Sequence, residues 1–272
     1  MQVGFIGDIH GRSHWKDIIK SSPEVEHWVF IGDYVDSFFV PDIVILHNLN
    51  EIIQTKLANP EKITLLWGNH DVMYAIPEVA GKCAGYRMNM YVALSELFRS
   101  HLSLFQYAWQ RGNVLATHAG VTSEWIDSHA SVFKKFGLMD DMSNIAEVIN
   151  NIGETSQEKI LHDICPSRTN FPTADAGGPL WVDESKLDNN LPYQLKQVGG
   201  HTGVDEITVS LGALDMDMLN KHGVHFNIDV LNRLDREGPV VVLELNDRLF
   251  SPVDTCGWKS EWNEYFLILD IK

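Results

Sequence analysis

Cysteine is scarce in this chain, since its 272 residues include only Cys83, Cys165 and Cys256. The three lie far apart and form no CxxC pair, which argues against a disulfide scaffold or a zinc ribbon. Apolar runs are also short, and none approaches the roughly 18 residues of a membrane span. No signal peptide precedes the first expected strand. We therefore expect a soluble cytoplasmic protein with no membrane partner.

Basic side chains are outnumbered, with 21 lysines and arginines against 37 aspartates and glutamates, a net charge of −16. So acidic a protein repels extended nucleic acids and anionic membranes. A small anionic substrate stays compatible with it, because bound divalent cations would reverse the field locally. The chain also has no GxxxxGK[ST] or GxGxxG after its first strand, which excludes the P-loop and dinucleotide-binding classes.

Strands and helices alternate in the first part of the chain. The expected strands are "QVGFIGD", "HWVFIGD" and "KITLLWGNHD", and each ends in glycine followed by polar residues. Between them we expect helices over "SHWKDIIKSS" and "PDIVILHNLNEIIQTKLAN", the second with an apolar residue at every third or fourth position. This order predicts parallel strands joined by right-handed crossovers. Ligands bind beyond the carboxyl ends of such strands.

The second part of the chain begins with helices over residues 122 to about 165 and a loop-like stretch to Pro192. Five further strands are expected, at "QLKQVGGHTGV", "EITVSLG", "GVHFNID", "PVVVLEL" and "EYFLILDI". We expect them to form a second, largely antiparallel sheet. The predicted fold is α/β, with two layered mixed β-sheets flanked by helices. We predict one domain over residues 1–272, with a helical and loop insert near 122–195.

Five polar clusters follow strands in this prediction. They are Asp8 and His10 in "GDIHG", Asp33 and Asp36 in "GDYVD", Asn69 and His70 in "GNHD", His118 in "THAG", and His201 in "GGHTG". Carboxylate oxygens, imidazole nitrogens and an amide oxygen suit Mn²⁺, Fe or Zn²⁺ better than metals that prefer thiolates. The alternation in Asp8-x-His10 lets both side chains point to one ion. The clusters therefore predict a metal site.

In this order the clusters resemble those of the calcineurin-like metallophosphoesterases, over Gly7 to about Asp229. Within them the chain is most similar to the phosphoprotein-phosphatase branch, which includes serine/threonine phosphatases and symmetrical diadenosine tetraphosphate hydrolases. The resemblance implies a centre of two divalent ions. Asp8 and His10 would bind the first ion, Asp33 would bridge both, and the second would be completed by Asn69, His118 and His201. A carboxylate has two oxygens, which suits Asp33 to a bridging position.

The resemblance also implies the reaction, attack of a hydroxide bridging the two metals on a phosphate ester. His70 would protonate the leaving oxygen, and Asp36 would orient the imidazole; Asp71 would have no direct chemistry. The expected function is a serine/threonine phosphatase-like phosphomonoesterase acting on a phosphorylated substrate, either a protein or a nucleotide-like molecule. The alternatives are a dinucleoside polyphosphate hydrolase, an enzyme for a small or cyclic phosphodiester, and a non-catalytic protein that binds metal and phosphate.

The chain departs from this branch after "GDYVD", where the branch usually has Arg-Gly and this sequence has Ser37 and Phe38. A bidentate arginine clamp on the phosphate is therefore missing from its expected position. Arg12, Arg87 or Arg168 could replace it, and Ser37 could donate one neutral hydrogen bond. Aromatic residues near the motifs could also contact a ring in the substrate. They are Tyr34, Phe38, Phe39, Trp67 and Tyr74, and we expect Tyr34 or Phe38 to form a wall of the site.

Overall fold

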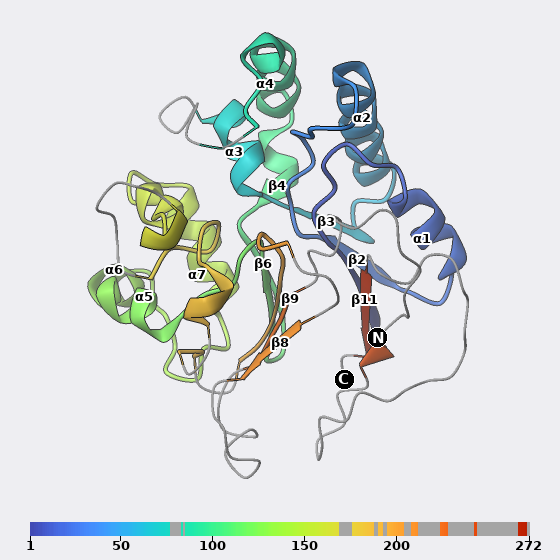
Figure 1. Cartoon of the computed structure of the whole chain (residues 1–272). Coiled ribbons are helices and arrows are strands. Elements are labelled where there is room, and N and C mark those ends of the chain that lie inside the picture. The colour runs from blue at the N-terminus through green and yellow to red at the C-terminus, as the bar shows by residue number, and fades with distance from the viewer. Residues whose placement is uncertain are drawn as a thin grey trace. The chain divides into compact units, whose positions relative to one another are not determined.

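The computed structural model describes residues 1–76, 83, 85–168, 176–187, 190–192 and 195–203, and the backbone of strands 208–211, 224–227, 242–243 and 266–270. Two compact units divide the chain, Met1–Phe105 with Val230–Lys272, and Gln106–Asp229. The prediction of a mixed α/β fold with two sheets flanked by helices is confirmed (Figure 1). The prediction of a single domain with an insert stays a prediction. Among the described residues, no helix has the length and apolar character needed to cross a membrane.

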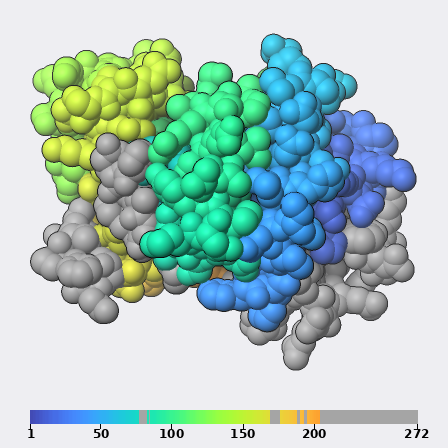
Figure 2. Space-filling view, turned by 90° about the horizontal axis from the view of Figure 1, so that it is seen from above, coloured from blue at the N-terminus to red at the C-terminus, as the bar shows by residue number. Residues whose placement is uncertain are grey.

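The first unit is built on a six-stranded sheet with the order β10-β11-β1-β2-β3-β4. Its N-terminal strands are β1 (Gln2–Ile6), β2 (His27–Phe30), β3 (Ile63–Leu66) and β4 (Phe105–Gln106). The predicted parallel pairing of β1, β2 and β3 is confirmed. The helices that follow these strands are α1 (Trp15–Ser21), α2 (Asp42–Ala58), α3 (Asn69–Ala75) and α4 (Tyr91–Arg99). Helices α2 and α4 lie side by side on one face of this unit (Figures 1 and 2).

The strands at the end of the chain correct the predicted topology. Strands β10 (Val242–Leu243) and β11 (Phe266–Asp270) belong to the first sheet and not to the second. Strand β11 pairs antiparallel with β1, with Gln2 opposite Asp270, and Figure 1 shows it on the first sheet. An apolar strand pattern identifies a buried strand but not its partner, because pairing between chain ends is a long-range property.

The second unit contains a five-stranded sheet with the order β5-β6-β7-β9-β8. Its strands are β5 (Ala108–Arg111), β6 (Val114–Thr117), β7 (Lys196–Gly199), β8 (Thr208–Leu211) and β9 (Val224–Asn227). The predicted antiparallel character is wrong for its centre, since β6, β7 and β9 run parallel. Helices α5 (Ser123–Ser128), α6 (Ala130–Lys135) and α7 (Ile145–Gly153) precede β7, while the expected helix at "QEKILHDI" is a 3-10 turn over Glu158–His162.

Each unit has its own buried core beneath the loops that carry the polar clusters. In the first unit, Phe5, Val29 and Leu65 on neighbouring strands are completely buried. In the second, Leu115 and Val198 on the parallel strands are buried in the same way. Burying one such side chain contributes about 1.5–3 kcal/mol. The strands are therefore a firm base for the loops at their carboxyl ends.

Candidate active site

The loops after β1, β2 and β7 have an unusual backbone conformation. Among the described residues, five that are not glycine have a positive φ, and four of these are predicted site residues. They are His10 at 44°, Asp33 at 52°, Asp36 at 60° and His201 at 70°. A left-handed conformation costs a non-glycine residue on the order of 1–3 kcal/mol and persists only where surrounding contacts enforce it. The surrounding contacts thus hold the backbone of these four residues in a strained conformation, which orients their side chains.

Hydrogen bonds join the two loops directly. The backbone N–H groups of Ile9 and His10 both donate to the carbonyl of Asp33, at 3.0 and 2.7 Å. The loop after β3 approaches from the other side, where a Cβ added to Gly68 would lie 2.2 Å from the Asp33 nitrogen. Only glycine fits at position 68, and this close approach lets His70 N–H donate to Asp33 Oδ1 at 2.9 Å. Three separate segments therefore converge on Asp33.

His10 is oriented as a metal ligand. Its Nδ1 lies 2.9 Å from the carbonyl of Val35 and 2.7 Å from that of Asp36. Since both neighbours are acceptors, Nδ1 carries the proton and donates it, and the lone pair lies on Nε2. That Nε2 is 3.7 Å from Asp33 Oδ2. Burial lowers the pKa of His10, which favours the neutral imidazole that binds cations.

Carboxylate groups gather at the same place. Asp8 and Asp33 are 1% and 2% exposed, and each offers an oxygen within 4.8 Å of the other. Two buried carboxylates so close repel one another unless a cation or a proton lies between them. Together with His10 they make a set of oxygen and nitrogen donors that suits a divalent metal.

His70 lies beside this group and forms a pair with Asp36. The imidazole Nδ1–H donates to Asp36 Oδ2 at 2.9 Å, and Nε2 lies 3.9 Å from Asp33 Oδ2. Burial alone would lower the pKa of His70, but the charge of Asp33 and the hydrogen bond to Asp36 raise it well above its ordinary value. An imidazolium stabilised in this way can act as a proton donor. A cation bound at Asp33 would reduce the rise, because it neutralises that carboxylate.

Asn69 and Asp71 flank His70 on α3 and are both buried. The amide nitrogen of Asn69 donates to Cys83 Sγ at 3.0 Å, which fixes the orientation of the amide. Asp71 accepts the backbone N–H groups of Gly68 and Tyr34, each at 2.9 Å. One carboxylate therefore caps the start of α3 and ties it to the loop after β2. Asp71 supports the site without touching the reacting groups.

Tyr74 extends the His70–Asp36 pair into a longer network. Its hydroxyl donates to Asp36 Oδ1 at 2.5 Å and accepts the backbone N–H of Arg87 at 3.0 Å. Burial, followed by the charge of Asp36, raises the pKa of this phenol, so that it remains a donor. Each oxygen of Asp36 thus has its own partner, Tyr74 on one and His70 on the other. The hydroxyl of Tyr74 holds Asp36 in the rotamer that faces His70.

We expect Tyr74→Phe to lower kcat about tenfold for phenyl phosphate, whose leaving group needs a proton, and much less for 4-nitrophenyl phosphate. The phenylalanine keeps the ring packing against Tyr86 but leaves Asp36 less restrained. Steady-state kinetics on both esters measure the effect. The matched control is Tyr107→Phe in the second unit, which also removes a hydroxyl that donates to a carboxylate, Glu158 Oε1 at 2.6 Å. An equal loss on both esters would contradict a role in orienting the proton donor.

In the second unit, the two remaining predicted ligands lie together. The rings of His118 and His201 are 5.2 Å apart, and Gly200 N–H donates to the carbonyl of His118 at 2.6 Å. Trp181 lies against His201, with 5.5 Å between the ring centres. His118 follows β6 and His201 follows the parallel neighbour β7, which brings both to the same edge of the sheet. The parallel pairing of these strands therefore explains why residues 83 positions apart are neighbours.

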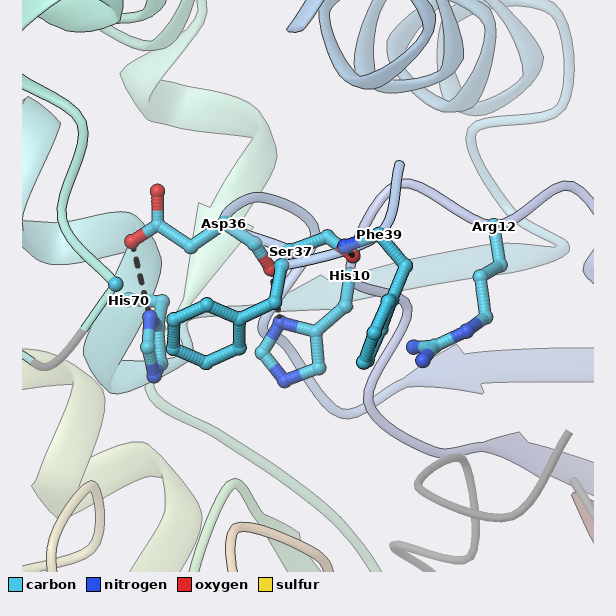
Figure 3. A pocket seen from close by; sticks show the side chains of 8 residues that line it. His10, Arg12, Asp36, Ser37, Phe39 and His70 are labelled. Atoms are coloured by element: carbon cyan, nitrogen blue, oxygen red, sulfur yellow. Dashed lines mark hydrogen bonds and ion pairs between the residues drawn. The ribbon is translucent and has the colours of Figure 1, made fainter. Parts of the chain in front are cut away.

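A cavity of about 180 Å³ opens at the loops of the first unit. Figure 3 shows His10, His70, Arg12 and Phe39 pointing into it. Among the described residues, its lining consists of His10, Arg12, Asp36, Ser37, Phe38, Phe39, His70 and Gly85. Two residues that the sequence proposes for substrate contact, Arg12 and Ser37, are therefore at the cavity.

Two other predicted substrate contacts lie elsewhere. Tyr34 is completely buried and its hydroxyl donates to the carbonyl of Leu66 at 2.9 Å. Of the two residues considered as a wall of the site, Tyr34 or Phe38, it is Phe38 that lines the cavity. Arg87 is ion-paired with Asp42 and does not line the cavity. Arg168, in the second unit, is ion-paired with Asp183 at 2.7 Å.

Comparison with known proteins decides the family. The sequence model of the family described as "calcineurin-like phosphoesterase" matches residues 1–243. This chain belongs to the calcineurin-like phosphoesterase family. A comparison with curated proteins finds no match. One similar solved structure is a protein serine/threonine phosphatase from Saccharomyces cerevisiae with similarity to human phosphatase PP5, at 13% identity and a TM-score of 0.41, covering all of this chain and 81% of that one. Another is a metallophosphoesterase from Sphaerobacter thermophilus, at 10% identity and a TM-score of 0.38, covering 84% and 76%.

As a calcineurin-like phosphoesterase, the chain is a metal-dependent hydrolase of phosphate esters. The donors in its first unit fit that chemistry, because Asp8, Asp33 and the Nε2 of His10 offer oxygen and nitrogen atoms to one region. His70 is close to them but faces the cavity with its second nitrogen.

The phosphoesterase also depends on residues whose roles sequence reasoning does not find. Asp71 stands inside "GNHD" and is interpreted as a neighbour without chemistry, while Tyr74 is considered only as an aromatic surface. The available signal is spacing, since Tyr74 lies one helical turn after His70 on α3 and shares its face. Nothing in the sequence indicates the contact between Cys83 and Asn69.

Proposed function

We propose that this chain is a phosphomonoesterase with machinery of the serine/threonine phosphatase type. The observation that carries the proposal is the His70–Asp36 pair, which opens on the cavity beside the buried carboxylate of Asp33. A protein that only bound metal and phosphate would have no use for a histidine held by a carboxylate on one nitrogen and directed into the cavity by the other. This argues against the non-catalytic alternative.

Two divalent ions fit the proposed ligands, and Mn²⁺ is the first choice for their mixture of carboxylate, imidazole and amide groups. Asp8 and His10 would hold one ion, Asp33 would bridge, and Asn69, His118 and His201 would hold the other. Bound ions of this kind supply an activated hydroxide and neutralise charge on the phosphate. The exposure of Asp33, only 2%, supports its role, because a dry bridging ligand interacts more strongly with cations.

The side chains of this protein supply the remaining steps. His70 would donate a proton to the leaving oxygen, and Asp36 would keep the imidazole oriented and stabilise its charge. Arg12, at the cavity wall, would attract the phosphate and align it. Ser37 would contribute one neutral hydrogen bond.

The first candidate substrate is a phosphorylated protein. The second is a phosphodiester or a dinucleoside polyphosphate. The observation that favours this candidate is the role of Ser37 in its loop. Its Oγ accepts the backbone N–H groups of Phe39 and Val40 at 3.3 and 3.2 Å, so the side chain holds the turn. No bidentate guanidinium stands at that position. A diester bears less charge than a monoester dianion, so it has less need of such a clamp.

The test is hydrolysis of 4-nitrophenyl phosphate and bis-4-nitrophenyl phosphate after metal has been removed by a chelator. We expect no activity in the stripped protein and recovery with Mn²⁺, because the ions supply the nucleophile. A higher kcat/KM for the monoester supports the first candidate, and a higher value for the diester supports the second. Hydrolysis that survives chelation, or none with any divalent ion, would overturn the proposed function.

A further inference from the structure

Two consecutive phenylalanines stand in water at the mouth of the cavity. Phe38 is 80% exposed and Phe39 is 84% exposed, and both line the space that His10 and His70 enter. A phenyl ring left in water forgoes the free energy that burying it would contribute. One exposed apolar side chain is ordinary, but here two consecutive phenylalanines both line the same cavity. This surface, Phe38 with Phe39, is called the aromatic wall below.

The loop that carries the aromatic wall is held in place. Ser37 Oγ accepts the N–H groups of Phe39 and Val40, which closes a tight turn immediately before α2. On the other side, Gly85 has a φ of +82°, and a Cβ at this position would be 3.6 Å from Phe38 Cζ. The ring of Phe38 therefore rests close to the Gly85 backbone. The backbone that carries the two rings is therefore fixed before a substrate binds, which lowers the entropy cost of ordering this loop.

The cavity combines this apolar wall with polar groups of defined charge. Arg12 supplies a cation and, as Figure 3 shows, its guanidinium points into the cavity on the side of Phe39. His10, His70 and Asp36 line the same cavity and carry the proposed metal-binding and proton-donating roles. A substrate that matches both halves has an anionic phosphate joined to a flat apolar group. An aromatic ring gains stacking energy from phenylalanine that a saturated chain or ring of similar size does not.

We propose that the aromatic wall selects phosphate esters whose ester group carries a planar aromatic ring next to the phosphate. The inference rests on the proposed function, because it assigns a substrate class to the same cavity. It applies to monoesters and diesters alike, since the ring and not the number of ester bonds is recognised. The related phosphatases usually have Arg-Gly at the positions of Ser37 and Phe38, and that arginine binds the phosphate. In this chain Phe38 binds the leaving group instead.

The test compares benzyl phosphate with cyclohexylmethyl phosphate in the presence of Mn²⁺. Both leaving groups are primary alcohols on a six-membered ring, so they differ mainly in planarity. We expect kcat/KM to favour the benzyl ester about tenfold, because stacking on an aromatic side chain is worth about that factor. In the double variant Phe38→Leu/Phe39→Leu, which keeps apolar bulk, we expect the ratio to fall close to one through a higher KM for the benzyl ester.

The control variant is Ile43→Ala/Met88→Ala, which removes two apolar side chains that are 71% and 81% exposed and do not line the cavity. It should keep the wild-type ratio. Equal kcat/KM values for the two esters in the wild type would overturn the inference while leaving the proposed function intact. A preference retained by the leucine variant would also overturn it. Absence of metal-dependent hydrolysis of both esters would instead overturn the proposed function.

Discussion

Replacing Asp33 by asparagine is expected to abolish metal-dependent hydrolysis. Asp33 Oδ2 faces both His10 and His70, and Oδ1 accepts the N–H of His70. The asparagine keeps the shape and one acceptor, but it loses the charge and places an amide NH₂ where a ligand is required. Loss of a group that only supports a ligand weakens metal binding about 10–100-fold. We expect a larger loss for Asp33→Asn, with Mn²⁺ content below the level of detection after gel filtration.

Thermal unfolding separates this effect from misfolding. Wild-type protein should gain about 2.7 kcal/mol of stability at a metal concentration 100 times Kd, seen as a higher Tm with Mn²⁺. Asp33→Asn should lose this shift yet unfold no earlier without metal. Burial and then the charge of Asp33 raise the pKa of Asp71, and the variant removes that charge and the repulsion it causes. Asp163→Asn, which removes a carboxylate hydrogen-bonded to His129 in the second unit, should keep the shift. A full Mn²⁺ shift in Asp33→Asn would contradict the assignment.

Replacing His70 by asparagine should lower kcat about 10²–10⁴-fold for phenyl phosphate, the range typical of losing a general acid. The loss should shrink for 4-nitrophenyl phosphate, because its leaving group departs without a proton. Metal content should stay near the wild-type value, since the imidazole faces the cavity and its Nδ1 is occupied by Asp36. The measurement is kcat on a series of aryl phosphates whose phenols differ in pKa.

The quantity that tests this prediction is the slope of log kcat against the pKa of the phenol. It should be shallow in the wild type and steep in His70→Asn. His129→Asn is the matched control, because His129 Nε2 lies 2.7 Å from Asp163 Oδ2 in a similar pair that belongs to the second unit. That variant should keep the shallow slope. Parallel slopes for wild type and His70→Asn would show that His70 does not donate the proton.

Sequence reasoning predicts the polar clusters well, because they combine two independent signals. Asp8, Asp33 and Asn69 each follow an apolar strand, and parallel strands present their carboxyl ends at one edge. The structure brings His10, in the loop after β1, close to His70, at the start of α3, with 5.2 Å between their ring centres. Strand patterns and motif residues are local properties, which a sequence displays directly.

The rest depends on contacts that a sequence does not display. Tyr34 directly follows Asp33, but its ring turns inward and its hydroxyl finds Leu66. Asp71 acts through a backbone N–H 37 positions away. An aromatic or acidic residue beside a motif can face either side of the chain, and only the surrounding packing decides which. The pairing of β11 with β1 also depends on contacts between distant parts of the chain, which a strand pattern does not display.

The pairing of β11 with β1 has a consequence for the order in which a newly made chain can become active. Strand β1 leads into the Asp8–His10 loop, yet one of its two neighbours is made of residues 266–270. When the first 260 residues have been translated, every residue proposed as a metal ligand has been made. Strand β1, which leads to Asp8, still lacks its partner on one edge. Unpaired edges attract other strands. Protection of that edge, and with it support for the Asp8–His10 loop, has to wait until residues 266–270 have left the ribosome.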